Sequence, residues 1–272
     1  MTNGAAVVRQ PVLAVSHGAA GLTLAPGDRT RQELRAAGAV LARSRPSSIV
    51  VVSAHWRTPS VGVASGPRPT TVHDHPLTAV HDYRYRAVGD PDLAATAHEL
   101  LVAAGLKADL VEDRGRDHGA WIPLSLLRPA ADLPVVQISL LDVGPAADEQ
   151  HLALGRALAP LRELGVLIVT SGGVTHDQQE FRRRWTAGSN PQLHTPESAR
   201  FAAWTDEVLT GPSRTSRLQG WRRRPDVERL HPTDEHFLPF VVAVGAAGDH
   251  ERCERLFAAF QHDLCTSAYR FG

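Results

Sequence analysis

Five histidines lie at or beside the ends of short apolar segments in this chain. Four of them, His17, His55, His118 and His176, follow predicted strands, and His236 opens an apolar segment near the C-terminus. The carboxyl ends of the strands in an open α/β sheet form the ligand crevice, so side chains that leave separate strands there can converge. Gathered imidazoles can bind a first-row metal or transfer protons near neutral pH. The pattern therefore predicts a metalloenzyme.

Candidate metal ligands come from two strand ends and one helix start. His17 and His55 have small residues beside them, which leaves room for a metal ion and a substrate. A lone histidine at such a position more often hydrogen-bonds to a loop than binds a metal. Two histidines at equivalent strand ends make a structural role and a metal-binding role about equally favoured. A third ligand could be His236 or Glu235: two histidines with a carboxylate form the facial triad of non-haem iron oxygenases, and three histidines suit Zn(II) or Fe(II). The residues alone leave this choice open, as well as a plain structural role for both.

The other two histidines lie in different surroundings. His118 belongs to an Asp-His-Gly-Ala-Trp sequence in a predicted turn, and His176 follows a strand and a pair of glycines. Both suit acid–base groups that reach a bound substrate without holding the metal. A competing interpretation makes Ser171 a nucleophile with His176 as its base, but no Gly-x-Ser-x-Gly elbow supports it.

Three polar segments, 66–89, 113–123 and 181–195, do not fit the alternation of strands and helices. Long irregular stretches inside a compact domain are usually lids or binding loops. The first of them contains several histidines and tyrosines, most of which we expect to be solvated. One arginine near these segments could hold a substrate carboxylate; the candidates are Arg84, Arg86 and the triplets at 182–184 and 222–224.

The composition is that of an ordinary globular protein, with 43% hydrophobic and 21% charged residues. A formal net charge of zero argues against a nucleic-acid or membrane-surface partner. The two cysteines form no CxxC pair, which suits a reducing compartment and argues against a thiolate metal site. We expect a cytoplasmic protein, because the chain opens without a signal-peptide pattern and has no apolar stretch of about 18 residues.

Short apolar segments alternate with amphipathic helical patterns, which is typical of an α/β fold. The length of 272 residues fits one large domain, so we predict a single catalytic domain over residues 1–272. The predicted strands span residues 11–16, 48–54, 61–64, 108–111, 135–140 and 166–170. The predicted helices span residues 30–43, 91–104, 149–164, 198–209, 235–246 and 251–260.

Taken together, the motifs resemble those of the class III extradiol ring-cleavage dioxygenases, the protocatechuate 4,5-dioxygenase B-subunit superfamily, and within it the DOPA extradiol dioxygenase branch. The resemblance covers nearly the whole chain, and the order and spacing of the motifs make it specific. The motifs are Ser16-His17-Gly18, Ser53-Ala54-His55-Trp56, Thr71-Val72-His73-Asp74, Asp117-His118-Gly119-Ala120-Trp121, Ser171-Gly172-Gly173 with Thr175-His176, and Pro232-Thr233-Asp234-Glu235-His236 with Pro239.

The resemblance implies a fold with a central mixed β-sheet flanked by helices, and an active site at the carboxyl ends of the strands. It implies that His17, His55 and His236 bind one divalent metal, with Fe(II) expected for activity and Zn(II) as a further ion for the site. His176 matches the base, and His118 matches a second histidine that contacts the substrate. The implied reaction opens the ring of a catechol-type aromatic diol with O₂ to give a semialdehyde. We expect a monomer or homodimer.

The loop after His73 departs from the branch. The branch usually carries a Phe-x-Gly-Phe-Pro segment there, whereas this chain has the shorter and less aromatic His75-Pro76-Leu77. The family places this loop near the substrate, so the departure bears on the choice of catechol, which the sequence leaves open between DOPA, a protocatechuate-like acid and others. We expect His73 and Trp121 to line the substrate site. Two other functions stay open at this point: a zinc hydrolase that uses a metal-bound water, and a non-catalytic binding protein on the same fold.

Overall fold

The computed structural model describes residues 8–75, 80–144 and 147–272. Its elements in chain order are β1 (Val12–Ser16), α1 (Ala20–Thr23), α2 (Arg29–Leu41), η1 (Ala42–Ser44), β2 (Ser48–Thr58), β3 (Val61–Ala64), α3 (Pro91–Ala103), β4 (Ala108–Val111), α4 (His118–Leu127), β5 (Val135–Leu141), α5 (Ala147–Leu158), η4 (Ala159–Leu164), β6 (Val166–Gly172), α6 (Gln178–Thr186), α7 (Pro196–Thr210), α8 (Arg214–Leu218), η5 (Trp221–Arg223), α9 (Val227–Leu230), α10 (Leu238–Ala247), β7 (Cys253–Gln261) and β8 (Leu264–Phe271).

One mixed sheet of eight strands, in the order β4-β3-β5-β2-β6-β1-β8-β7, runs through the molecule. Its centre is parallel, because β6 pairs in parallel with both β1 and β2, and β2 pairs in parallel with β5. The antiparallel pairs are β3 with β5, β1 with β8, and β7 with β8. The predicted α/β fold with a central mixed sheet is therefore confirmed.

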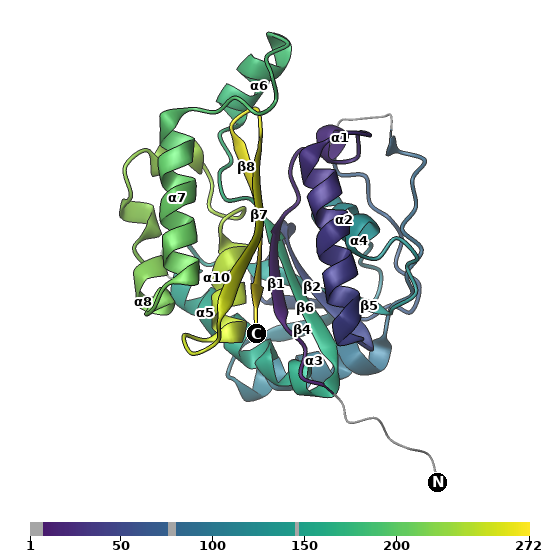
Figure 1. The fold of residues 1–272 in the computed structure, drawn as a ribbon. Coiled ribbons are helices and arrows are strands. Elements are labelled where there is room, and N and C mark those ends of the chain that lie inside the picture. Colours follow the sequence, from purple (N-terminus) through teal and green to yellow (C-terminus); the bar gives the residue numbers. More distant parts are fainter. Residues whose placement is uncertain (1–7, 76–79, 145–146) are drawn as a thin grey trace.

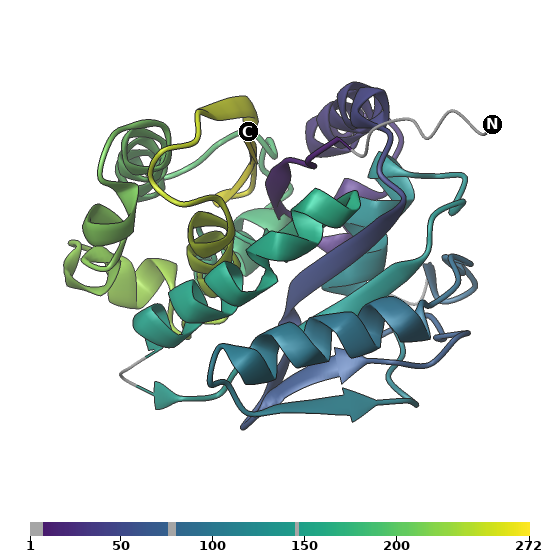
Figure 2. The same ribbon diagram turned by 90° about the horizontal axis from the view of Figure 1, so that it is seen from below.

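Helices cover both faces of the sheet (Figure 1). Alternate residues of the central strands point to opposite faces, so Val12 and Ala14 pack in one core cluster while Leu13 and Val15 pack in the other. The first cluster contains the apolar sides of α3, α5, α7 and α10, and the second contains those of α2 and α4. Seen from below, α3 and α5 lie side by side on the same face (Figure 2).

The central strands bring the predicted site residues together at the carboxyl ends of the strands. Ser16, the last residue of β1, pairs with Gly172 of β6, and Ser53 of β2 pairs with Ser171 of β6. Because β6 lies between β1 and β2, the residues that follow these positions leave the sheet side by side. His55 lies inside β2 and not beyond it, since β2 continues to Thr58 through a register shift against β5. Such a bulge re-aims the side chains of the extra residues.

The predicted helix at 251–260 is wrong. These residues form most of β7, which pairs with β8 in a hairpin that closes the sheet edge beside β1. The hairpin turns through His262 and Asp263, which both have positive φ angles of 48° and 88°. Two adjacent residues with positive φ match the tight turns that suit the twist of a hairpin, but His-Asp is not the Asn-Gly or Asp-Gly pair that marks such a turn in a sequence.

Two of the segments predicted to be irregular contain helices. The segment 113–123 holds the start of α4, whose N-cap is Asp117, so His118 begins a helix instead of lying in a free turn. The segment 181–195 overlaps α6, which is capped by Asp177. The helix predicted at 149–164 is α5 followed by the 3-10 turn η4, and it ends at Gly165 with a φ of 82°. Within the described residues, no helix combines the length and the apolar character that a bilayer crossing requires.

Close backbone packing between α5 and α10 depends on glycines, which gives a first prediction. A Cβ atom at Gly155 would lie 2.1 Å from the carbonyl oxygen of Val242, and one at Gly245 would lie 2.3 Å from that of Leu152. Gly155→Ala should therefore force the helices apart, cost about 1–3 kcal/mol and lower the thermal midpoint by several degrees. Gly220→Ala is the control, because its Cβ would meet only ordinary contacts at 3.5 Å. Equal melting temperatures for the two variants would contradict this account of the packing.

Candidate active site

The five predicted histidines lie in one cluster. The ring centroids of His17, His55 and His236 are 4.9, 5.4 and 5.0 Å apart from one another. The ring of His118 lies 3.8 Å from that of His55, and the ring of His176 stacks on that of His236 at 3.4 Å. Residues from β1, β2, α4, the β6–α6 connection and the turn before α10 thus meet at the carboxyl ends of the central strands.

Hydrogen bonds on the outer ring nitrogens set the orientation of two imidazoles. The Nδ1 atom of His17 lies 3.1 Å from Oγ of Ser171, and Nδ1 of His236 lies 2.8 Å from Oε1 of Glu235. Nε2 of His17 faces Nε2 of His55 at 3.1 Å. A histidine that binds a metal commonly uses its second nitrogen in such a bond, which fixes the tautomer. Both rings are therefore held with Nε2 free for an ion.

The cluster favours unprotonated imidazoles. Burial, followed by the charges of neighbouring imidazoles, lowers the pKa of His17 and His236 well below the usual value. Burial also lowers the pKa of His55, with the charge of His118 as the next cause. A neutral ring keeps the lone pair that a metal needs. Two sets of donor atoms lie within 4.8 Å of one another: His17, His55 and His118, and His176, Glu235 and His236.

His118 is fixed by a carboxylate. Asp74 accepts a hydrogen bond from the backbone N–H of His118 at 2.9 Å, and Nδ1 of His118 lies 2.9 Å from the same oxygen. Burial alone would raise the pKa of Asp74, but the hydrogen bond and charge of His118 hold it below its usual value. Asp117 accepts from the backbone N–H of Ala120 at 3.1 Å and from Oγ of Ser53 at 2.6 Å, which ties the start of α4 to β2.

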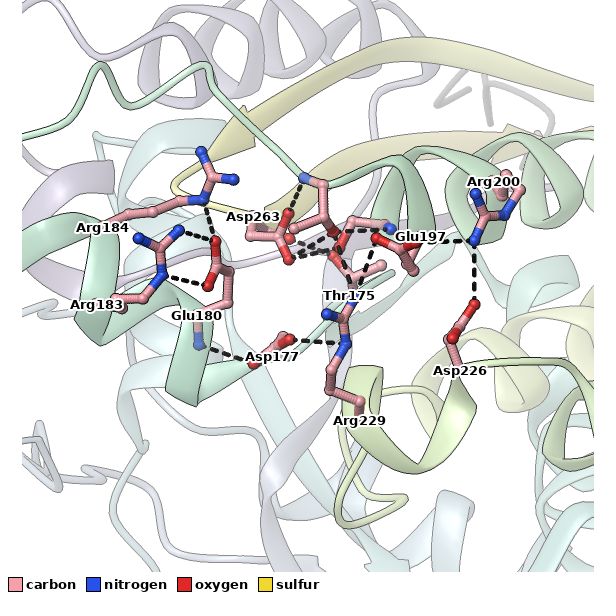
Figure 3. A network of polar contacts seen from close by, with 12 residues as sticks. Thr175, Asp177, Glu180, Arg183, Arg184, Glu197, Arg200, Asp226, Arg229 and Asp263 are labelled. Atoms are coloured by element: carbon pink, nitrogen blue, oxygen red, sulfur yellow. Dashed lines mark hydrogen bonds and ion pairs between the residues drawn. The ribbon is translucent and has the colours of Figure 1, made fainter.

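Polar contacts hold the chain on both sides of His176, and Figure 3 shows those of its neighbours Thr175 and Asp177. The backbone N–H of His176 donates to the carbonyl oxygen of Leu230 at 2.7 Å. On one side, Oγ1 of Thr175 donates to the carbonyl oxygen of Asp263 at 2.8 Å; on the other, Asp177 caps α6 and lies 3.4 Å from Nε of Arg229. Burial lowers the pKa of the His176 ring to about 4, which favours the neutral form of the ring.

Glycines allow the close approach of the chains that carry the histidines. A Cβ atom at Gly172 would lie 2.1 Å from the carbonyl oxygen of His236, and one at Gly119 would lie 2.8 Å from Cδ2 of His55. Ser171 is fully buried between these segments, where its hydroxyl donates to the carbonyl oxygen of Gly119 and contacts His17. The hydroxyl of this serine is thus engaged by Gly119 and by His17, which directly follows β1, and no contact with His176 is among its hydrogen bonds.

A cavity of about 440 Å³ opens over the histidine cluster. The two residues predicted to line the substrate site are not among the described residues that line this cavity. Trp121 is fully buried with its indole N–H bonded to the carbonyl oxygen of Val72, and His73 contacts the carbonyl oxygen of Tyr83. His75 reaches the cavity instead. The shortened loop beyond it includes Pro76 and Leu77, which lie outside the described residues.

The sequence suggested a role for Ser171 only as a nucleophile and no role for Asp74 or Asp117, although both acids stand in the motifs that carry the family resemblance. Their positions carried a usable signal, because Asp74 and Asp117 directly adjoin candidate histidines and Ser171 lies near the carboxyl end of β6. What could not be foreseen is which histidine each of them contacts, since the partners come from other elements.

Comparison with known proteins agrees with this geometry. Residues 12–271 match the family described as the catalytic LigB subunit of aromatic ring-opening dioxygenase. The 4,5-DOPA dioxygenase extradiol of Portulaca grandiflora is 37% identical over 84% of this chain and 83% of that protein, and the protein of the same name from Escherichia coli K12 is 35% identical over 88% and 85%. A crystal structure of an uncharacterized Escherichia coli K12 protein covers 97% of this chain and 100% of that chain, with a TM-score of 0.80 and 29% identity.

The fold and the histidine cluster thus define a ring-opening dioxygenase. The chain belongs to the LigB family of class III extradiol dioxygenases. The predicted family and the predicted extradiol ring cleavage are confirmed, and neither a zinc hydrolase nor a non-catalytic binding protein is favoured. The family implies a metal, an aromatic substrate and O₂, and the histidine cluster is the candidate metal site.

The contacts of Glu235 give a second prediction. Its Oε2 atom lies 3.5 Å from Nη1 of Arg57, which also bonds Asp234 at 3.1 Å, whereas Arg222 reaches Asp234 and not Glu235. Glu235→Ala should weaken metal binding by about 10- to 100-fold, because the ring of His236 loses the partner that orients it. Arg57→Gln should weaken binding less, and Arg222→Gln should leave it unchanged.

A chelator-competition titration of each purified variant with Zn(II) measures these affinities. Equal weakening by Arg57→Gln and Arg222→Gln would show that the effect is general loosening of the turn before α10.

Proposed function

We propose that this enzyme holds one divalent metal ion on His17, His55 and His236 and opens the ring of a catechol beside its two hydroxyl groups. Fe(II) is the ion that we expect for activity, and Zn(II) is a further ion that suits three imidazoles. The observation that carries the proposal is the face-to-face approach of Nε2 of His17 and Nε2 of His55 at 3.1 Å, with His236 beside both rings. Mutually facing acceptor nitrogens favour a cation between them.

Support for this ligand set comes from the partners of the rings. His17 and His236 each have a side-chain partner on Nδ1, as metal-binding histidines commonly do. Nδ1 of His118 likewise lies 2.9 Å from the carboxylate of Asp74, and we assign His118 to the substrate because its motif matches the substrate-contacting histidine of the family. A divalent ion would supply Lewis-acid polarisation and a template that brings diol and O₂ together.

The remaining histidines supply proton transfers. His176 is neutral, borders the cavity and stacks on His236, so its ring can accept a proton from a substrate hydroxyl beside the metal position. His118 also borders the cavity, and because its Nδ1 lies 2.9 Å from Asp74, its Nε2 is the ring nitrogen that we expect to face the substrate. Each such transfer is typically worth about 100- to 10,000-fold in rate. Cleavage beside the diol yields a semialdehyde.

We further place the enzyme in the cytoplasm, as a monomer or homodimer. The location is supported by Cys253 and Cys265, which are buried and free thiols, as a reducing compartment maintains them.

The activity is tested by anaerobic reconstitution with Fe(II), followed by oxygen uptake with a panel of catechols. We expect stoichiometric oxygen uptake and a coloured semialdehyde product with Fe(II), and none with Zn(II). Absence of uptake with every catechol tested, in protein shown to contain Fe(II), would refute the proposed reaction.

The division between ligand and base gives a third prediction. His17→Ala, His55→Ala and His236→Ala should lose metal and activity together, because two remaining imidazoles hold a divalent ion poorly. His118→Ala and His176→Ala should keep near-stoichiometric metal while kcat falls by about 100-fold or more. Metal content of each purified variant decides the assignment. An empty His176→Ala beside a loaded His236→Ala would exchange the roles of these two histidines.

A further inference from the structure

The polar side chains of helix α6 lie on two faces of the helix, and one of these faces borders the cavity. Residues three, four and seven positions apart share one side of a helix. The cavity-lining residues of α6 follow this spacing: Gln178, Phe181, Arg182 and Trp185. The helix projects beyond the sheet near the β7–β8 turn (Figure 1). These four side chains form part of the wall of the cavity.

Arg183 and Arg184, the neighbours of Arg182 in the 182–184 triplet, both bind the carboxylate of Glu180 (Figure 3). Arg183 donates to Glu180 through Nε at 2.7 Å and Nη2 at 2.6 Å, and Nε of Arg184 donates to it at 2.6 Å. The hydrogen bond from Arg183 is the largest cause that lowers the pKa of Glu180, to about 2. The one carboxylate of this helix is therefore already shared by two guanidinium groups.

Arg182 has no carboxylate partner among the described residues. Its polar contact there is a hydrogen bond from Nη2 to Oε1 of Gln178 at 3.1 Å. Nε2 of that glutamine lies 3.3 Å from Nε2 of His176. The side-chain amide of Gln178 thus links the guanidinium of Arg182 to the ring of the proposed base His176.

The cationic and the anionic side chain that line the cavity differ in whether they already have a charged partner. Among its described lining residues, Arg182 is the one guanidinium and Asp74 is the one carboxylate. Asp74 already binds the backbone and ring of His118. An anionic substituent would therefore meet an available cation, whereas an ammonium group would meet no available acid. A carboxylate suits the guanidinium because the pair can form two parallel charge-assisted hydrogen bonds.

We propose that Arg182 binds a carboxylate on the ring substituent of the substrate, and that the enzyme prefers an anionic catechol acid to a zwitterionic catechol amino acid. This rests on the proposed function, because it assumes that the catechol ring lies at the histidine cluster. Phe181 and Trp185, on the same face of α6, pack against the carbons that link ring and carboxylate. The preference would separate this chain from relatives whose names give DOPA, an amino acid, as the substrate.

Three catechols with three-carbon substituents test the proposal: 3-(3,4-dihydroxyphenyl)propionate, neutral 4-propylcatechol, and DOPA. The Fe(II)-loaded wild-type enzyme should favour the propionate over 4-propylcatechol in kcat/KM by on the order of 10-fold, and should also favour it over DOPA. Arg182→Gln should remove most of the preference for the propionate over 4-propylcatechol, mainly by raising KM for the propionate, and Arg182→Lys should restore part of it. Arg183→Gln is the matched control and should keep the wild-type ratio, because Arg183 binds Glu180 away from the cavity.

An unchanged ratio in Arg182→Gln, an equal loss in Arg183→Gln, or a wild-type preference for DOPA would overturn the proposal. Anaerobic calorimetry of propionate and 4-propylcatechol binding to the same proteins provides a readout that does not need turnover. Failure of the reaction itself is recognised separately, as loss of oxygen uptake with all three catechols, and in that case the calorimetric ratio between wild type and Arg182→Gln still decides the role of Arg182.

Discussion

Crowding of five imidazole rings in one largely buried space is the constraint on which the rest of this structure depends. Rings as close as His55 and His118, or His176 and His236, cannot both carry a proton without strong repulsion at low local dielectric. Burial is the largest cause of the lowered pKa values of His17 and His236, and the charges of the neighbouring imidazoles lower them further. Neutral imidazoles such as those of His17 and His55, whose Nε2 atoms face each other at 3.1 Å, suit a divalent cation, and a neutral ring beside them can accept a proton.

The architecture meets this constraint by taking each ring from a different element. Because β2, β6 and β1 are parallel and adjacent, His17 and His55 lie at the same end of the sheet, at the carboxyl ends of these strands. The register shift in β2 lies between Val52 and Arg57, at the position of His55. Ser171 on the strand between them contacts His17. Gly119 and Gly172 let α4 and the turn before α10 approach closely enough to add two more rings. A Cβ atom at either position would collide with a histidine: with the backbone of His236 at Gly172, and with the ring of His55 at Gly119.

Much of this arrangement could be predicted from the sequence, because strand ends in a parallel sheet converge by geometry. The positions of His17 and His176 after apolar strands carried that information. The β7–β8 hairpin was missed, since its turn uses His262 and Asp263 in conformations that these residue types rarely adopt. The start of α4 was missed because its residues are buried on all sides, which hides the helical period of polar and apolar positions. Contacts such as Glu180 with Arg183 and Arg184 decide which arginine is available, and they appear only when the helix is formed.

Anomalous X-ray scattering at the iron edge, from crystals grown anaerobically with Fe(II), tests the central claim most directly. The account predicts one strong peak bounded by Nε2 of His17, His55 and His236, at metal-to-nitrogen distances of about 2.0–2.2 Å. His118 and His176 should lie outside that coordination distance once a catechol is bound. A peak held by His176 and Glu235 without His17 and His55, or no peak in protein that turns over a catechol, would contradict it.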